Sequence, residues 1–256
     1  MAMQGRIALV TGAGSGMGRL ACRMMAAQGA RVAALDRDAE GLAATAAGAA
    51  AIFSQQVDVT DFAAVKAAVA LVESTIGPVH RVYHCAAIMP LGKLLEQDNA
   101  TVHRLMDINY GGLVNVAQAA LPAMVARGAG DFISFSSLAG WLPMLGVGAY
   151  NASKFAVSAF TEVLYHENLA SGVRFACVCP PPVATPLLRQ GFDTGMPKTI
   201  ADIEPIEPQV VLDAIEAGLA KGEFWIFPGK GARRAALMRR LLPGLCWKGI
   251  HEKEGY

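Results

Sequence analysis

The chain has 256 residues, of which 54% are hydrophobic and 17% charged, with a formal net charge of +1. This composition supports a sizeable buried core and excludes intrinsic disorder. The near-neutral charge gives no reason to expect a nucleic-acid partner. The five cysteines are odd in number and mostly lie in apolar segments, so we expect reduced thiols, no metal site and a cytoplasmic location.

Short apolar runs alternate with helical segments along the whole chain. The first apolar run begins at residue 6, so we expect no signal peptide before it. We expect strands at 6–10, 30–36, 52–59, 79–86, 131–137, 173–179 and 224–227. We expect helices at 17–28, 38–47, 61–76, 99–125 (with a break at Gly111-Gly112), 150–170 and 208–220. The alternation predicts an α/β fold, a doubly wound parallel sheet of about seven strands with helices on both faces, in a single domain over 1–256. No apolar run is long enough to predict a membrane span.

Two segments depart from the alternation. Residues 180–208 are rich in proline and glycine, and we expect an irregular loop there whose part 186–207 forms a lid over the substrate. The tail 231–256 is a basic amphipathic segment. We favour packing of this tail on the domain edge or at a subunit interface, and contact with a membrane surface is the alternative.

A glycine-rich turn follows the first predicted strand and opens the first predicted helix. Glycine lets the backbone approach a phosphate closely, and the helix N-terminus stabilises its negative charge. Asp36 ends the next strand, where a carboxylate can accept hydrogen bonds from ribose hydroxyls and repel the extra phosphate of NADP. NAD is therefore the favoured cofactor, although Arg37 could accommodate that phosphate. The residues expected at this end are Gly12, Ser15, Gly16, Met17, Gly18, Asp36, Arg37, Asp58 and Val59.

Tyr150 and Lys154 lie four residues apart, so they share one face of a predicted helix. A nearby ammonium favours the phenolate and lowers the pKa of a tyrosine. The pair is therefore a candidate acid/base device for an alcohol or carbonyl oxygen. Alone it is weak, because the same spacing occurs by chance in many helices.

Together these features resemble the short-chain dehydrogenase/reductase family over about the first 230 residues. The motifs that carry the resemblance are the glycine pattern 11–18, Asp58-Val59, Asn109, Ser137, and Tyr150 with Lys154. Ser137 precedes Tyr150 by the thirteen positions typical of the family, and its neighbour Ser136 would point to the opposite face of a strand.

The resemblance implies a mechanism of hydride transfer between a nicotinamide cofactor and a substrate carbon. Tyr150 would be the general acid/base, and Ser137 would orient the carbonyl. Lys154 would bind the nicotinamide ribose and lower the tyrosine pKa. Asn109 would hold a water molecule of a proton relay. The alternative is that this asparagine only forms a kink in the helix. Further cofactor contacts are implied for Cys85, Ala86, Ala87, Tyr150, Lys154, Pro180, Val183 and Thr185.

Two segments differ from the family pattern. His84-Cys85-Ala86-Ala87 stands where the family usually has Asn-Asn-Ala-Gly, and Pro180-Pro181-Pro182 stands where it usually has Pro-Gly. Pro181 lacks an N–H and has a fixed φ, so the second segment should be stiff. We expect His84 to be structural and Cys85 to be a packed thiol.

The substrate pocket is expected between the segments that follow the fourth, fifth and sixth strands. Its predicted wall is apolar and comprises Ala139, Trp141, Leu142, Leu145, Val147, Leu187, Leu188, Phe192 and Met196. This predicts a hydrophobic secondary alcohol or ketone as substrate. The alternative is a nucleotide-binding regulator or scaffold that has lost catalysis. By resemblance we also expect a homodimer or homotetramer that pairs through 99–126 and 150–170.

Overall fold

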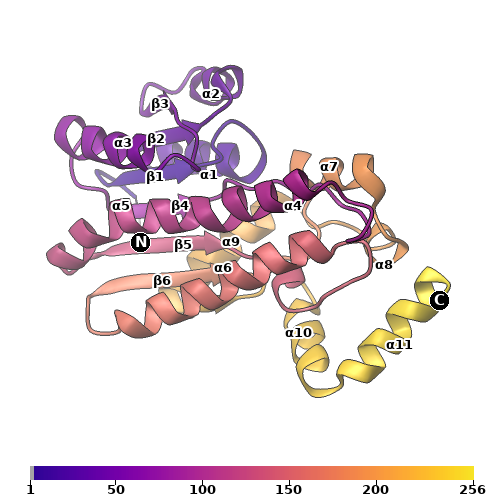
Figure 1. Cartoon of the computed structure of the whole chain (residues 1–256). Helices are drawn as coiled ribbons and strands as arrows, with labels where there is room; N and C mark the ends of the chain where they lie inside the picture. The colour runs from indigo at the N-terminus through magenta and orange to yellow at the C-terminus, as the bar shows by residue number, and fades with distance from the viewer. Residues whose placement is uncertain (1–2) are drawn as a thin grey trace.

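The computed structural model describes residues 3–256, which form one seven-stranded sheet with every neighbouring pair parallel (Figure 1). The strands follow the order β3-β2-β1-β4-β5-β6-β7, so the winding direction reverses between β1 and β4. The strands are β1 (Ile7–Thr11), β2 (Arg31–Asp36), β3 (Ile52–Gln56), β4 (Arg81–His84), β5 (Gly130–Phe135), β6 (Val173–Val178) and β7 (Trp225–Ile226). The predicted doubly wound parallel sheet is confirmed.

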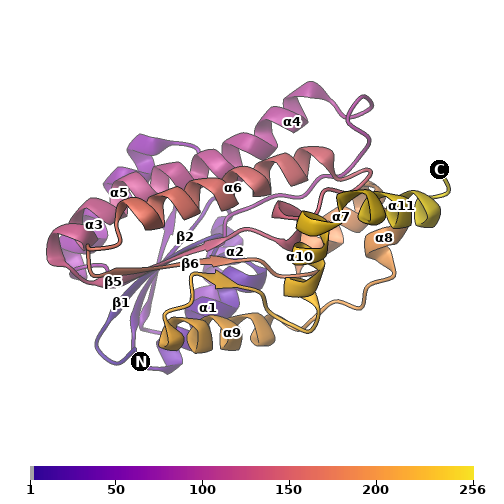
Figure 2. The same ribbon diagram turned by 90° about the horizontal axis from the view of Figure 1, so that it is seen from below.

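Helices cover both faces of this sheet (Figure 2). One layer holds α1 (Gly16–Ala27), α2 (Ala39–Ala46) and α9 (Pro208–Lys221), and the other holds α3 (Phe62–Thr75), α5 (Gly112–Arg127) and α6 (Gly148–Glu167). The remaining helices are α4 (Asn99–Met106), the π turn η1 (Asp107–Gly111), the 3-10 turn η2 (Leu138–Gly140), α7 (Pro186–Gly195), α8 (Lys198–Ala201), α10 (Ala232–Leu241) and α11 (Pro243–Glu254).

Each helical layer has its own apolar core against the sheet. Met25 and Ile215 are fully buried between α1, α9 and one face. Val65, Leu113 and Val157 are fully buried on the other face. With both faces covered, every residue of the central strands β1 and β4 is buried, whereas the edge strand β3 is mostly exposed.

Several predicted boundaries are corrected by the structure. Strand β3 ends at Gln56 instead of 59, β4 is shorter than 79–86 at both ends, and α6 begins at Gly148 instead of 150. The segment 180–208, predicted as irregular, contains α7 and α8. Pro186 is the first residue of α7, where proline's missing N–H costs nothing and its fixed φ suits a helix.

The C-terminal segment is also corrected, because it forms two helices at an angle instead of one amphipathic helix (Figure 1). Pro243 starts α11, and a proline inside one continuous helix would clash with the preceding turn. Within residues 3–256, no helix is long and apolar enough to cross a membrane.

The predicted break in the 99–125 helix is confirmed at the expected place. The π turn over Asp107–Gly111 separates α4 from α5. Single π turns inside helices are frequent at functional sites. This one brings Asn109 to the loop that follows β4.

Candidate active site

A cavity of about 470 Å³ lies at the carboxyl ends of the strands and extends from the glycine-rich turn to α7, α8 and α11. In doubly wound sheets, ligands bind at this edge, where the winding reverses. All the predicted cofactor-binding residues line this one cavity: Gly12, Ser15, Gly16, Met17, Gly18, Asp36, Arg37, Asp58, Val59, Cys85, Ala86, Ala87, Tyr150, Lys154, Pro180, Val183 and Thr185.

The glycine-rich turn forms one wall of the cavity and has no room for side chains. Gly12 has φ +65°, and a Cβ there would meet the Ala86 backbone nitrogen at 2.7 Å. A Cβ on Gly18 would overlap the Gly12 carbonyl oxygen. The turn therefore requires glycine at both positions, and its backbone can lie directly against a bound phosphate.

Asp36 is fixed at the adenosine end of the cavity. Its Oδ2 accepts a hydrogen bond from the Gly14 N–H at 2.8 Å, and its Oδ1 accepts one from the Asp38 N–H at 2.9 Å. Both bonds orient the carboxylate and leave it further lone pairs for the hydroxyls of a ribose. These residues therefore fit a dinucleotide, and a ribose-binding role for Asp36 stays a prediction.

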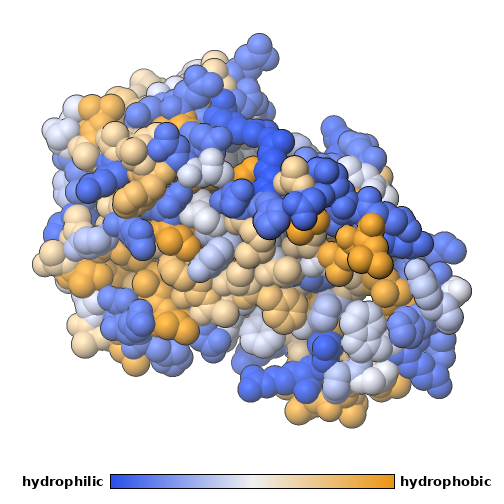
Figure 3. Space-filling model, viewed as in Figure 1, coloured by the Kyte–Doolittle hydropathy of each residue, from blue (hydrophilic) through white to orange (hydrophobic). Residues whose placement is uncertain are grey.

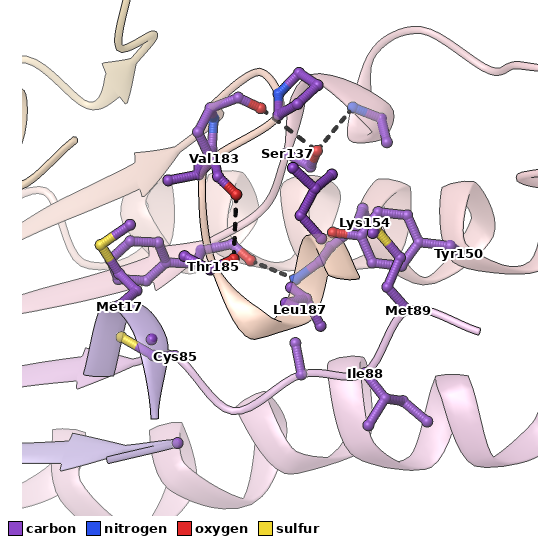
Figure 4. Close-up of a pocket in the computed structure, with 18 of the residues that line it drawn as sticks. Met17, Cys85, Ile88, Met89, Ser137, Tyr150, Lys154, Val183, Thr185 and Leu187 are labelled. Atoms are coloured by element: carbon purple, nitrogen blue, oxygen red, sulfur yellow. Dashed lines mark hydrogen bonds between the residues drawn. The ribbon is translucent and has the colours of Figure 1, made fainter. Parts of the chain in front are cut away.

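Three of the four predicted catalytic side chains meet at the centre of the cavity (Figure 4). Tyr150 and Ser137 line the same part of the cavity, and the Ser137 Oγ accepts the Ala139 N–H at 3.1 Å. The Lys154 Nζ lies 5.7 Å from the centre of the Tyr150 ring and donates to the Phe135 carbonyl at 2.8 Å.

The neighbouring serine does not compete for this position. The Ser136 hydroxyl is buried, donates to the Lys154 carbonyl at 3.0 Å and pairs with the Ser158 hydroxyl at 2.7 Å. The Ser136 hydroxyl is thus occupied by buried partners, and the catalytic role of Ser137 stays a prediction.

Burial changes the proton affinities of the central pair in opposite directions. Desolvation raises the pKa of the Tyr150 hydroxyl well above its ordinary value, and the Ser137 hydrogen bond opposes this rise. Desolvation also lowers the pKa of Lys154 to about 8. Burial therefore gives Tyr150 a raised pKa here, opposite to the lowered value expected from Lys154.

Asn109 lies behind the cavity wall instead of on it. Its Oδ1 accepts the Ile88 N–H at 2.8 Å, and its Nδ2 donates to the Ile88 carbonyl and the Ser153 hydroxyl, each at 3.0 Å. These bonds use the whole amide to connect η1, the loop after β4 and α6. The side chain therefore positions neighbouring elements, and a role in holding a water stays a prediction.

His84 and Cys85 are packed, as expected. The His84 Nδ1 is 2.9 Å from the Thr11 hydroxyl, and burial lowers the pKa of this imidazole to about 3. Burial raises the pKa of Cys85, so its thiol is protonated and a poor nucleophile. Pro180 accepts the Leu138 N–H at 2.8 Å through its carbonyl, so the proline segment is tied to the loop that carries Ser137.

Beyond Tyr150, the cavity becomes apolar. Six predicted wall residues line it, namely Ala139, Leu142, Val147, Leu187, Leu188 and Met196. Three do not: Trp141 packs on Trp225, Phe192 is exposed, and Leu145 is absent from the lining. The sequence prediction missed Ile88, Met89, Met144, Ile200, Ile203 and Ile250.

Helix α7, in the segment predicted to be a lid, packs on the loop that follows β4. The Met89 N–H donates to the Gln190 side chain at 2.6 Å, and the Leu91 N–H donates to the Thr194 hydroxyl at 2.8 Å. A Cβ on Gly191 would meet the Met89 methyl carbon at 2.5 Å, so helix and loop are in close contact. Among residues 3–256, no cluster of His, Cys, Asp and Glu could hold a metal ion.

A glycine-rich turn, a ribose acceptor and a Ser-Tyr-Lys cluster at this edge of a doubly wound sheet define a nucleotide-dependent oxidoreductase. The short chain dehydrogenase family matches residues 6–194, and the chain belongs to that family.

Relatives and solved structures agree with this assignment. A Mycobacterium tuberculosis protein named as an oxidoreductase, SadH, is 33% identical over 93% of this chain and 91% of its own. Galactitol 2-dehydrogenase (L-tagatose-forming) of Cereibacter sphaeroides is 40% identical over 72% of this chain and 73% of its own. A Burkholderia phymatum short chain dehydrogenase/reductase in complex with NAD superposes with a TM-score of 0.86 at 25% identity, covering 96% of each chain.

Proposed function

We propose that this enzyme transfers a hydride between NAD(H) and a hydrophobic secondary alcohol or ketone. The observation that carries the proposal is the position of Tyr150 and Ser137 in the lining of one cavity, where its polar cofactor end meets its apolar end. The bound nicotinamide supplies or accepts the hydride. The protein must supply the proton and hold the substrate oxygen.

In the reduction direction, Tyr150 donates its phenolic proton to the carbonyl oxygen as the hydride reaches the carbon, and oxidation reverses both transfers. The Ser137 hydroxyl hydrogen-bonds the same oxygen and orients it. Lys154, anchored on the Phe135 carbonyl, would hold the ribose of a bound nicotinamide cofactor with its remaining N–H groups. Asn109 fixes Ile88 and Ser153, and so keeps η1 and α6 in register beside the tyrosine.

The lining of the substrate end supports an apolar substrate. Its side chains are aliphatic or methionine, with Thr199 and the serine at the centre as polar exceptions. Among the described lining residues, Lys154 and Arg37 are the only Lys or Arg, and both belong to the cofactor end. A charged substrate would thus find no partner charge and would lose its hydration. The relative that acts on galactitol handles a polar polyol, so the substrate class is inferred from the cavity of this chain.

NAD is the proposed cofactor, because the fixed Asp36 carboxylate would lie beside the 2′ position of the adenosine ribose and repel a phosphate there. Arg37 also lines the cavity and opposes this preference.

Turnover over a panel of apolar ketones and alcohols, sugars and hydroxy acids tests the proposal. Tyr150→Phe should lower kcat by about 10²–10⁴-fold, the usual contribution of a positioned acid/base. Tyr165→Phe is the matched control on the same helix, where the ring stacks on Phe224, and it should change kcat by less than about twofold. Unchanged activity of Tyr150→Phe, or faster turnover of charged hydroxy acids than of apolar alcohols, would refute the proposal.

A nucleotide-binding regulator remains the second candidate, because the 84–87 and 180–182 segments depart from the family pattern. Quenching of protein fluorescence by NADH without turnover of any compound in the panel would favour it. Intact Ser137, Tyr150 and Lys154 support the enzyme instead, since binding alone does not need a buried acid/base group.

We also propose that the chain forms a homodimer or homotetramer through α5 and α6. Phe155 and Val163 on α6 are 41% and 56% exposed, and Leu169, just beyond the end of this helix, is 62% exposed, which is unusual for large apolar side chains so close together. A monomer mass by light scattering would contradict this.

A further inference from the structure

The corner between α10 and α11 presents an exposed apolar surface, which we call the apolar corner (Figure 3). Its members are Leu237, Met238, Leu241, Leu242 and Leu245, and they are 47–65% exposed. Single exposed leucines are ordinary, but five large apolar side chains at one protruding turn mark a surface that meets something other than water (Figure 1).

Positive charge surrounds the apolar corner. Residues 229–256 contain seven Lys or Arg and two Glu, whereas the preceding residues contain fifteen Lys or Arg and nineteen Asp or Glu. Arg233, Arg234 and Arg240 on α10 are exposed. Within the described part of the chain, none of these three forms a salt bridge. The net charge of +1 is therefore the sum of a basic C-terminal segment, 229–256, and an acidic remainder of the chain, 1–228.

The two helices that carry the apolar corner pack on the rest of the domain. Ala232 and Ala236 on α10 are buried, and Ile250 on α11 is buried against the substrate end of the cavity. The Glu254 carboxylate accepts the N–H and the hydroxyl of Thr199 on α8, at 2.6 and 2.8 Å. The two helices therefore have an inner face that packs and an outer face on which no other element among residues 3–256 packs.

We propose that the apolar corner docks the protein on an anionic lipid membrane. Leucine and methionine side chains can enter the headgroup region, while the flanking arginines attract negatively charged lipids. A second copy of the chain is a poorer fit, because self-pairing at this surface would bring two strongly basic segments together. A nucleic acid would match the charge but not the aliphatic tip.

The docked orientation has a consequence for the substrate. Helix α11 carries the apolar corner near its start and Ile250, part of the cavity wall, near its end. An apolar alcohol or ketone dissolved in the bilayer would therefore lie close to the cavity. This consequence depends on the proposed function, but the docking itself does not.

Co-sedimentation of the full chain with vesicles tests the docking without any measurement of activity. Vesicles of equal parts phosphatidylglycerol and phosphatidylcholine should bind at least about tenfold more tightly than phosphatidylcholine alone, and added salt should weaken the binding. The double variant Leu241→Asp/Leu245→Asp should bind at least about tenfold more weakly, because two charges would have to enter the headgroup region. The triple variant Arg233→Gln/Arg234→Gln/Arg240→Gln should lose about a hundredfold.

Leu71→Asp on α3 is the matched control, since this leucine is 50% exposed and lies far from α10. It should bind vesicles as the wild type does, and circular dichroism should show all variants folded. Binding that is absent, equal on both vesicles or unchanged by the corner variants would overturn the proposal. So would a dimer in sedimentation equilibrium that the corner variants dissociate while vesicles bind nothing.

Discussion

Asp36→Asn should shift the cofactor preference from NAD toward NADP. The wild-type carboxylate is oriented by the N–H groups of Gly14 and Asp38, at 2.8 and 2.9 Å. Asparagine has nearly the same shape and keeps one acceptor oxygen, so it should retain one of the two N–H bonds that the carboxylate accepts, while the negative charge is lost. The substitution thus separates charge from shape.

The magnitude follows from Coulomb's law. Two unit charges about 5 Å apart interact by about 0.8 kcal/mol in water and about 3 kcal/mol at the effective dielectric of a protein surface. Asp36 is half-buried at the cavity rim, so a 2′-phosphate should be disfavoured by about 2 kcal/mol, or about thirtyfold. Removing the negative charge of Asp36 should therefore abolish most of this thirtyfold discrimination against the 2′-phosphate.

The assay is the ratio of kcat/KM with NADH to kcat/KM with NADPH, using one ketone. Asp36→Asn should lower this ratio about ten- to thirtyfold, and adding Arg37→Gln should reverse part of the change. Asp38→Asn removes a charge two residues away, where the carboxylate caps α2 through the Gly41 N–H at 3.1 Å and does not line the cavity. It should alter the ratio by less than about threefold. A wild type that prefers NADPH, or an unchanged ratio in Asp36→Asn, would refute the reasoning.

Two further predictions concern stability. Asp131→Asn should lower the free energy of unfolding in urea by about 3–5 kcal/mol. The Asp131 carboxylate lies 2.7 Å from the guanidinium of Arg81, which is 1% exposed, and its removal would leave that buried charge undercompensated. A loss below about 1 kcal/mol would contradict this. His84→Asn should reduce acid sensitivity. The folded pKa of about 3 lies below the unfolded value near 6.5, so the unfolded chain takes up the proton first, and stability falls as pH drops from about 6.5 toward 3. Between pH 7 and pH 5 the wild type should lose about 2 kcal/mol more than His84→Asn, and equal losses would show that His84 is not buried and neutral.

Local sequence signals were enough to predict which residues line the cavity beside the glycine-rich turn. Gly12 and Gly18 are required by close backbone contacts, and Asp36 follows directly from its place at the end of a strand. Such features depend on neighbours that the strand-turn-helix order already brings together. The interval between Ser137 and Tyr150 worked for the same reason, since β5 and α6 are adjacent in the chain.

The substrate end could not be predicted to the same extent. Ile250 reaches the cavity because α11 packs on α8, and the contact joins residues more than fifty positions apart through Glu254 and Thr199. Met89 lines the cavity because its N–H is held by Gln190 on the lid. No local pattern marks such contacts, since apolar residues in a tail or loop have many surfaces on which to pack.

The sequence also predicted the wrong direction for the pKa of Tyr150, and this direction affects which reaction is favoured. A lysine near a tyrosine predicts a lowered pKa in water, but Tyr150 and Lys154 are 6% and 3% exposed, and desolvation disfavours the charged form of each. Tyr150 thus rests neutral at pH 7 and holds a proton. In the proposed reaction, ketone reduction starts from this state, whereas alcohol oxidation needs the phenol to give its proton away first. Oxidation should therefore accelerate with pH throughout the range below the raised pKa of Tyr150, whereas reduction should not, and an oxidation rate that is independent of pH would contradict a neutral resting tyrosine.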